Sequence, residues 1–247
     1  MNKAIWITRP SQDAGYFENS LKDKGFTSIV EPLLRIKYNK INLETDNIQA
    51  LIFTSANGVR AYMYNRGRTD LPVYAVGDAT GMEAKNSGFE TVYISKGDVL
   101  FLSETIKEHA CSNSGALLHI AGSVIAKDLS ALLLAHNYKV NRKVLYEAVE
   151  RKTLTRTMQE TLNDDGITGV ILMSPRTARI FKEIIVSHNL HSIIPKLKLY
   201  CLSDAVAIQV RELGCGVIVA EHPTQVDIMD KITGVQYDER KNRTKEY

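Results

Sequence analysis

Short apolar runs rich in β-branched residues alternate with segments of helical period along almost the whole chain. The runs predict strands at residues 4–7, 50–53, 73–76, 91–94, 116–120, 170–173, 197–202 and 217–220. Between the strands, apolar residues recur at helical spacing in five sets: Ala14, Phe17, Leu21; Ile125, Leu129, Leu132; Leu154, Met158, Leu162; Ala178, Phe181, Ile185; and Val206, Val210, Leu213. Such alternation predicts parallel sheets with helices on both faces.

The chain contains an internal repeat. Residues 71–95 align without a gap to residues 197–221, and each copy follows an apolar strand, a Ser and a helix. Residues 4–26 align in the same way with residues 116–138. Because the second copy runs out of chain after its last helix near Ile232, we predict that the N-terminal strand-helix unit completes it.

The repeat predicts a discontinuous domain with a second domain inserted into it. The predicted parts are residues 1–35 with 148–237, the insert 36–147, and a flexible tail at 238–247. Two connections, at residues 32–38 and 143–149, alternate apolar and polar side chains and are therefore expected to be extended. Two antiparallel crossing strands would form a hinge, and the space between the domains is the default place for a ligand cleft.

Small hydroxyl residues and Gly follow the predicted strands. The turns are Thr8-Arg9-Pro10-Ser11, Thr54-Ser55-Ala56-Asn57-Gly58, Gly77-Asp78-Ala79-Thr80, Ala121-Gly122-Ser123, Ser174-Pro175-Arg176-Thr177 and Ser203-Asp204-Ala205. Each hydroxyl could simply cap a helix. Ligands of open parallel sheets bind at this edge, however, where helix N-termini offer N–H groups. Several such turns facing one cleft would bind a ligand with many carboxylates or phosphates.

Three larger side chains are further candidates. Arg9 and Arg176 stand near helix N-termini, where the helix dipole disfavours a purely structural cation, so they are better placed to meet an anion. Tyr146 is the one large polar aromatic on a predicted inter-domain strand. It is either a half-buried packing residue with a hydrated hydroxyl or a residue of the cleft.

Composition narrows the class of protein. The 247 residues are 44% apolar with a formal net charge of +3, which is typical of a folded globular chain rather than a disordered one. Three widely spaced cysteines without a CxxC motif argue against a disulfide framework or a structural zinc site. The pair His188 and His191 falls at a predicted helix end, so no metal is expected.

Several activities lack support in the sequence. GxGxxG, GxxxxGK[ST], GxSxG and HExxH are absent, which argues against dinucleotide, P-loop, hydrolase-elbow and zincin chemistry. The N-terminal apolar run is broken at Arg9-Pro10, so we predict no secretory signal and a cytoplasmic location. No run approaches the roughly 18 apolar residues of a membrane span, and the basic tail alone does not support nucleic-acid binding.

A set of short motifs in a fixed order gives the chain a family resemblance. The motifs are ITRP at 7–10, EPLLRI at 31–36, IFTSANGV at 52–59, AVGDAT at 75–80, AG at 121–122, LYEA at 145–148 and MSPRTA at 173–178. Over residues 4–232 the chain resembles the uroporphyrinogen-III synthase family. The resemblance implies an α/β fold class: two small parallel-sheet, flavodoxin-like domains with helices on both faces, joined by a two-stranded β-ladder. That fold agrees with the organisation predicted from the repeat.

The resemblance also implies a lyase activity. The expected reaction is a cofactor-free cyclisation of the linear tetrapyrrole hydroxymethylbilane to uroporphyrinogen III with loss of water. The terminal pyrrole ring is inverted through a spiro intermediate, whereas spontaneous closure gives the uninverted isomer. The protein must therefore mainly impose geometry on the substrate. A transient hand-over from hydroxymethylbilane synthase and a monomeric state are further expectations.

Family roles carry over by motif. Tyr146 is similar to the Tyr thought to assist departure of the hydroxyl, Ser55 and Thr80 match polar positions that line the cleft, and Ser174 matches the repeat-related counterpart of Ser55. The predicted substrate-binding set is Arg9, Ser55, Asn57, Thr80, Gly122, Ser174, Arg176 and Ser203. Val206 replaces a Thr of many relatives, which puts a hydroxyl contact there in doubt. The alternative function is a non-enzymatic two-domain binding module for a polyanionic small ligand.

Overall fold

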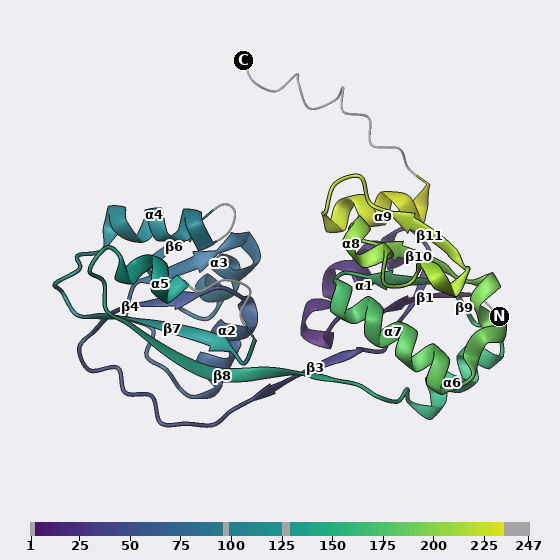
Figure 1. Ribbon diagram of the computed structural model, residues 1–247, viewed down its shortest axis with the longest axis horizontal. Helices are drawn as coiled ribbons and strands as arrows, with labels where there is room; N and C mark the ends of the chain where they lie inside the picture. Colours follow the sequence, from purple (N-terminus) through teal and green to yellow (C-terminus); the bar gives the residue numbers. More distant parts are fainter. Residues whose placement is uncertain (1–2, 96–98, 125–128, 235–247) are drawn as a thin grey trace, which may run out of the picture. The chain divides into compact units, whose positions relative to one another are not determined.

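Two sheets organise the chain, one in each of two units (Figure 1). The computed structural model describes residues 3–95, 99–124 and 129–234. Unit 1 comprises residues 1–35 and 150–247, and unit 2 comprises residues 36–149. The predicted tail at 238–247 and the helix residue Ile125 lie outside the described residues.

Unit 1 is built on five parallel strands in the order β11-β10-β9-β1-β2. The strands are β1 (Ala4–Ile7), β2 (Thr27–Val30), β9 (Ile167–Leu172), β10 (Lys198–Cys201) and β11 (Gly216–Val219). Its α-helices are α1 (Gly15–Asp23), α6 (Arg156–Asn163), α7 (Pro175–Ser187), α8 (Asp204–Ala207) and α9 (Gln225–Thr233), with 3₁₀ turns η1 (Ser11–Asp13), η2 (Leu190–Lys196) and η3 (Arg211–Leu213).

Both faces of this sheet are covered because successive strand side chains point to opposite sides. Trp6 faces α6 and α7 and packs edge-on against Phe181, with ring centroids 5.5 Å apart. Ile5 lies on the other face with Phe17 of α1 and Ile228 of α9. The single Trp of the chain is fully buried, and its Nε1 donates to the Glu31 carbonyl at 2.7 Å.

Unit 2 repeats this strand order and adds one strand, giving β3-β8-β7-β4-β5-β6. The strands are β3 (Leu34–Tyr38), β4 (Ile48–Phe53), β5 (Val73–Val76), β6 (Val92–Ser95), β7 (Ala116–Gly122) and β8 (Val140–Glu150). The helices are α2 (Ala56–Tyr64), α3 (Gly77–Asn86), α4 (Val99–His109) and α5 (Leu129–Leu134). Strands β4 to β8 pair in parallel, and two separate cores cover the faces, one with α2 and α3 and one with α4 and α5.

The chain passes between the units along β3 and β8, which are neighbours in the sheet. The Asn39 amide donates to the Leu145 carbonyl at 2.7 Å, and the Arg151 amide donates to the Leu33 carbonyl at 3.0 Å. Since one residue number rises as the other falls, the two segments run antiparallel. This is the predicted two-stranded ladder.

The structure corrects several predicted elements. The helix expected at residues 206–213 is broken, because α8 ends at Ala207 and the following turns use hydrogen bonds to the third preceding carbonyl. The β-branched residues Val206, Ile208 and Val210 disfavour a regular helix there. In α5, Leu133 rather than Leu132 is fully buried. Strand β2 was not predicted, since its sequence TSIV is short and only partly buried.

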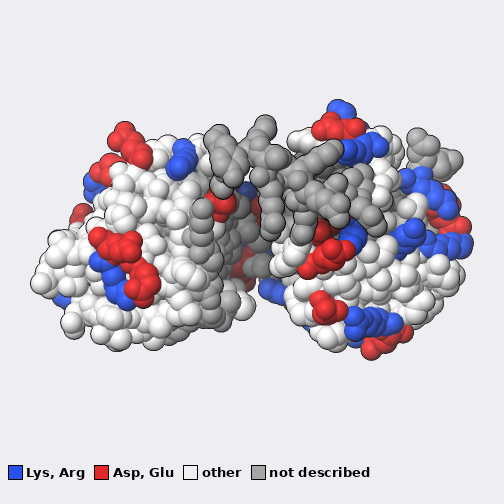
Figure 2. All heavy atoms as spheres, turned by 90° about the horizontal axis from the view of Figure 1, so that it is seen from above, with Lys and Arg blue, Asp and Glu red and all other residues white. Residues whose placement is uncertain are grey.

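Charges of both signs are interspersed on each unit over the face drawn in Figure 2. Lys231 pairs with Glu221 and Lys196 pairs with Asp165 in unit 1. Within the described part of the chain, no helix has the length and apolar character needed to cross a membrane.

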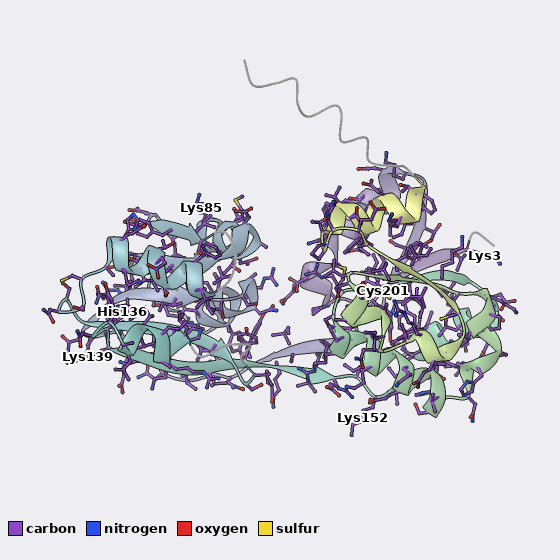
Figure 3. The ribbon with its side chains drawn as sticks, turned by 45° about the horizontal axis from the view of Figure 1, so that its top comes forward. Lys3, Lys85, His136, Lys139, Lys152 and Cys201 are labelled. Atoms are coloured by element: carbon purple, nitrogen blue, oxygen red, sulfur yellow. The ribbon has the colours of Figure 1, made fainter. Side chains whose placement is uncertain are left out.

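All three cysteines are free thiols. Figure 3 places Cys201 inside unit 1, whereas Lys85 and Lys139 point away from unit 2. Burial is the main reason that the pKa of the Cys201 thiol rises from 9.0 to about 12.

Candidate functional site

In unit 2, the carboxyl ends of three neighbouring strands lie within two residues of one another. Phe53 of β4 pairs with Ile120 of β7 and with Ala75 of β5. Gly122 is the last residue of β7, and the predicted Ser55 and the start of α3 with Thr80 follow the ends of β4 and β5. Parallel pairing therefore brings three turns that are far apart in sequence to one edge of the sheet.

Tyr146 lies over this edge on β8, which extends beyond β7. Gly122 pairs with Tyr146 in the sheet, and the Ser123 amide donates to the Tyr146 carbonyl at 2.9 Å. A Cβ on Gly122 would stand 2.9 Å from Cε2 and 3.0 Å from Cζ of the Tyr146 ring. The absence of a side chain at Gly122 is thus what allows the aromatic ring to lie there.

The Tyr146 hydroxyl has a defined partner and a shifted pKa. Burial raises the pKa of Tyr146 above its ordinary 10.0, and a side-chain hydrogen bond with Ser55 opposes this shift in part. Desolvation disfavours the phenolate, so the neutral phenol persists to higher pH than in water. At neutral pH the hydroxyl is therefore a hydrogen-bond donor that can also give up a proton to a strongly basic leaving group.

The helices that begin at this edge differ in how their first N–H groups are bound. Ser55 is the N-cap of α2, and its Oγ accepts from the Asn57 amide at 3.2 Å. Helix α3 has no side-chain cap, begins at Gly77 with φ +75°, and holds Thr80 in its first turn at 4% exposure. Its first N–H groups suit an anionic group better than a neutral one.

In unit 1 the start of α7 combines a cap with a charge network. Ser174 Oγ accepts from the Thr177 amide at 3.1 Å and lies 2.7 Å from Thr177 Oγ1. The Arg176 Nε donates to Glu150 Oε1 at 2.8 Å, and Arg179 Nη2 donates to the same oxygen at 2.6 Å. These two guanidinium groups, Arg176 first, hold the pKa of the Glu150 carboxyl below its ordinary 4.5.

Arg9 and Ser203 complete the set predicted for unit 1. Arg9 is partly buried and follows β1, and Ser203 precedes α8 after β10, so both stand beside the end of β9 where Ser174 lies. Ser203 makes no side-chain cap bond to the four-residue α8. Val206 is 1% exposed in the apolar core of unit 1, a position that suits its aliphatic side chain.

Two groups of polar residues at these edges escaped sequence reasoning. One is Arg60 with Glu83 in unit 2, and the other is Glu150 with Arg179 in unit 1. Arg60 and Arg179 occupy equivalent places in the aligned strand-Ser-helix segments, so the repeat itself carried a signal for both. Their carboxylate partners, Glu83 and Glu150, come from other elements, and no pattern in the sequence pointed to them.

Metal ligands do not gather in the described residues: the structure brings no three His, Cys, Asp or Glu side chains into a group that could hold an ion there. His188 follows the last residue of α7, and its Nδ1 lies 3.0 Å from the Ile184 carbonyl. His191 belongs to η2.

Comparison with known proteins identifies the family of this chain. A model of uroporphyrinogen-III synthase HemD matches residues 16–230, most of the chain. The chain belongs to the uroporphyrinogen-III synthase family. Members of this family are cyclising lyases, and the resemblance seen in the sequence motifs is thereby confirmed.

Individual relatives are similar to this chain in part of the sequence or in fold. A putative uroporphyrinogen-III synthase from Methanocaldococcus jannaschii is 43% identical over 56 residues, which span 22% of this chain and 23% of that relative. The crystal structure of uroporphyrinogen-III synthetase from Helicobacter pylori 26695 matches with a TM-score of 0.63 at 17% identity, over 96% of this chain and 100% of that one. A mutant uroporphyrinogen III synthase from the extremely thermophilic bacterium Thermus thermophilus matches with a TM-score of 0.50 at 12% identity, over 94% and 97%. The predicted α/β fold class is confirmed.

Proposed function

We propose that this chain converts hydroxymethylbilane into uroporphyrinogen III and water. The observation that carries the proposal is the family match over residues 16–230. The substrate is a linear tetrapyrrole with acetate and propionate arms on its rings. The chain closes this molecule into a macrocycle and turns the terminal pyrrole ring over.

Departure of the substrate hydroxyl begins the reaction. The Tyr146 phenol donates a proton as the C–O bond breaks, and water leaves behind an electrophilic azafulvene. The raised pKa of Tyr146 supports this role, because a neutral phenol is needed at the start of the step. The hydrogen bond with Ser55 and the fit of the ring over Gly122 hold the hydroxyl in one place.

Ring inversion follows from which carbon attacks. The substituted carbon of the terminal pyrrole attacks the azafulvene to give a spiro centre, which fragments and closes again with that ring reversed. A pyrrole C–H proton is lost as aromaticity returns, and this proton restores the Tyr146 phenol. Holding the bilane in the conformation that leads to the spiro centre is the main contribution asked of the protein.

The carboxylate arms supply the grip for that conformation. We assign the carboxylate arms to the N–H groups at the starts of α2, α3 and α7. The proposed neutral polar partners are Ser55, Asn57, Thr80, Ser174 and Ser203. The proposed cations are Arg9 and Arg176. The backbone at Gly122 completes the set. Arg176 already binds Glu150, so a substrate carboxylate would have to share or replace that partner.

The same proposal covers the setting of the reaction. The protein acts as a monomer in the cytoplasm and receives hydroxymethylbilane by transient hand-over from hydroxymethylbilane synthase. The chemical reason for hand-over is that free bilane closes spontaneously to the uninverted isomer. Diluting the two enzymes in a coupled assay should raise the share of that isomer if transfer is direct.

One experiment tests the function itself. Purified protein is incubated with freshly made hydroxymethylbilane without added metal or nucleotide, the products are oxidised, and the uroporphyrin isomers are separated. We expect mainly the type III isomer. A mixture indistinguishable from the protein-free control would reject the synthase activity and favour a non-enzymatic binding module.

A further inference from the structure

A polar chain links the first turn of α2 to α3 in unit 2. The Arg60 Nη1 donates to Asn57 Oδ1 at 3.1 Å, and its Nη2 donates to Glu83 Oε2 at 2.8 Å. The side chains of Arg60 and Glu83 are only 18% and 27% exposed. The guanidinium therefore lies between two fixed acceptors, one on each helix.

This arrangement decides which end of the Asn57 carboxamide points away from Arg60. Because an Arg side chain can only donate, the amide oxygen must turn toward it. The Nδ2 group is consequently the end directed away from Arg60. Asn57 sits next to Ser55, whose hydroxyl is the partner of Tyr146, so the carboxamide belongs to the edge of the sheet assigned to substrate.

The repeat supports a donor at this position. Aligning the two strand-Ser-helix segments puts Asn57 opposite Arg176 and Arg60 opposite Arg179. Arg176 has no acceptor atom, and in unit 1 a Glu150 carboxylate is its partner. A carboxylate is thus the group that the equivalent position already binds within this chain.

We propose that Arg60, held by Glu83, is a positioning residue that turns the Asn57 carboxamide so that its N–H groups meet a carboxylate arm of the tetrapyrrole. The inference rests on the proposed function and adds a determinant of substrate affinity to it. Arg60 itself does not touch the substrate. Its effect passes through the orientation of Asn57.

Exchanging the charges of Arg60 and Glu83 distinguishes an effect on the orientation of Asn57 from an effect on the stability of the fold. In the double variant Arg60→Glu with Glu83→Arg, the ion pair between α2 and α3 is kept. The carboxylate at position 60 now accepts from Asn57 Nδ2, so the amide turns over and presents its oxygen to the substrate. We expect the melting temperature to stay close to that of the wild type and kcat to change less than about twofold. KM should rise by up to about tenfold, because the substrate loses one hydrogen bond.

A matched control tests whether the rise in KM depends on Asn57. Asn57→Leu removes both ends of the carboxamide and should raise KM by a similar factor in the wild-type background. In the charge-exchanged background it should change KM no further, because the donor has already been lost. The proposal is overturned if the exchanged variant has both the melting temperature and the KM of the wild type. Arg60 would then be a purely structural residue.

Two readouts do not require turnover. Uroporphyrin III, which carries the same acetate and propionate arms, should bind the exchanged variant up to about tenfold more weakly by fluorescence titration. The side-chain amide protons of Asn57, assigned by their loss in Asn57→Leu, should exchange more slowly in the exchanged variant than in the wild type. If the wild type makes no type III isomer, the proposed function fails, while these two readouts still decide the inference about Arg60. Equal uroporphyrin binding or equal amide exchange rates in the wild type and the exchanged variant would reject that inference.

Discussion

The two units share a scaffold and differ in what its edges carry. Unit 1 has the order β11-β10-β9-β1-β2, and unit 2 has the matching order β6-β5-β4-β7-β8, in which each strand occupies the place of its repeat counterpart. The fifth strand is where they diverge, since β2 has four residues and β8 has eleven. Extending the alignment of Phe26 with Tyr138 without a gap puts Leu34 opposite Tyr146.

That single position shows how a duplicated fold specialises. Leu34 packs against the apolar core of unit 1, whereas Tyr146 is bound to Ser55 in unit 2. Unit 1 instead concentrates charge: Glu150 binds Arg176 and Arg179, and the 6% exposed Glu31 binds Arg151 and the Thr155 amide at 2.5 and 2.9 Å. Under the proposed function this gives a division of labour in which unit 2 alone supplies the proton donor, whereas both units supply groups for the carboxylate arms.

The largest expected effect concerns the independence of the units. Residues 36–149 contain the whole of both cores that cover the sheet of unit 2, so we expect this segment to fold by itself with a cooperative thermal transition followed by circular dichroism. An unfolded 36–149 segment beside a cooperatively folding 1–149 chain would contradict the discontinuous domain assignment.

The next effect tests the division of labour directly. Tyr146→Phe should lower kcat by about 10²-fold, the lower end for general acid assistance, because an electron-rich pyrrole already helps expel the hydroxyl. Ser55→Ala and Ser174→Ala each remove one hydrogen bond and should act mainly on KM, by about tenfold at most. Steady-state kinetics with thermal melts as a folding control will compare them, and an unchanged kcat for Tyr146→Phe would make this Tyr a packing residue.

The pH profile sharpens the same point. An acid works in its protonated form, so raising the pKa of Tyr146 above 10.0 extends the active range toward higher pH. The kcat of the wild type should therefore decline only above pH about 10, and Tyr146→Phe should lack this limb. Circular dichroism at each pH separates the titration from alkaline unfolding. A decline of the wild type centred near neutral pH would assign the acid to another group.

A smaller effect is expected from the contact beneath Tyr146. Gly122→Ala forces a Cβ to within 3.0 Å of the ring and should cost about 1–3 kcal/mol of unfolding free energy while lowering kcat. Gly15→Ala in unit 1 is the matched control, since nothing lies within 4 Å of a Cβ there, and should change stability by less than about 0.5 kcal/mol. Denaturant titration measures both. Equal stabilities of the two variants would show that the Tyr146 ring is free to move aside.

The smallest effect distinguishes the capping serines. Ser174→Ala should lower the free energy of unfolding by about 1 kcal/mol because its hydroxyl binds the Thr177 amide. Ser203→Ala should change it by only a few tenths, since Ser203 makes no cap bond. A comparable loss in both variants would mean that the short α8 depends on its N-cap after all.

Local sequence determined the alternation of strands and helices, because side-chain period and strand burial are set by neighbours in the chain. It also revealed the repeat, and with it the turns that carry Ser55 and Ser174. Prediction failed where the local signal was weak: TSIV of β2 is a short edge strand, and the period through Val206 and Leu213 does not reveal that the helix breaks at Ala207.

Tertiary structure alone decided the partners. Tyr146 and Ser55, Arg60 and Glu83, and Glu31 and Arg151 are distant in sequence, and each pair meets because strands or helices from different segments are packed at a particular register. A one-residue shift in the register of a strand would turn its side chains to the opposite face. The sequence therefore determined which chemical groups this protein has at the ends of its strands, and the packing of the sheets decided which of them touch, since hydrogen bonds require separations of about 3 Å that only the folded chain sets.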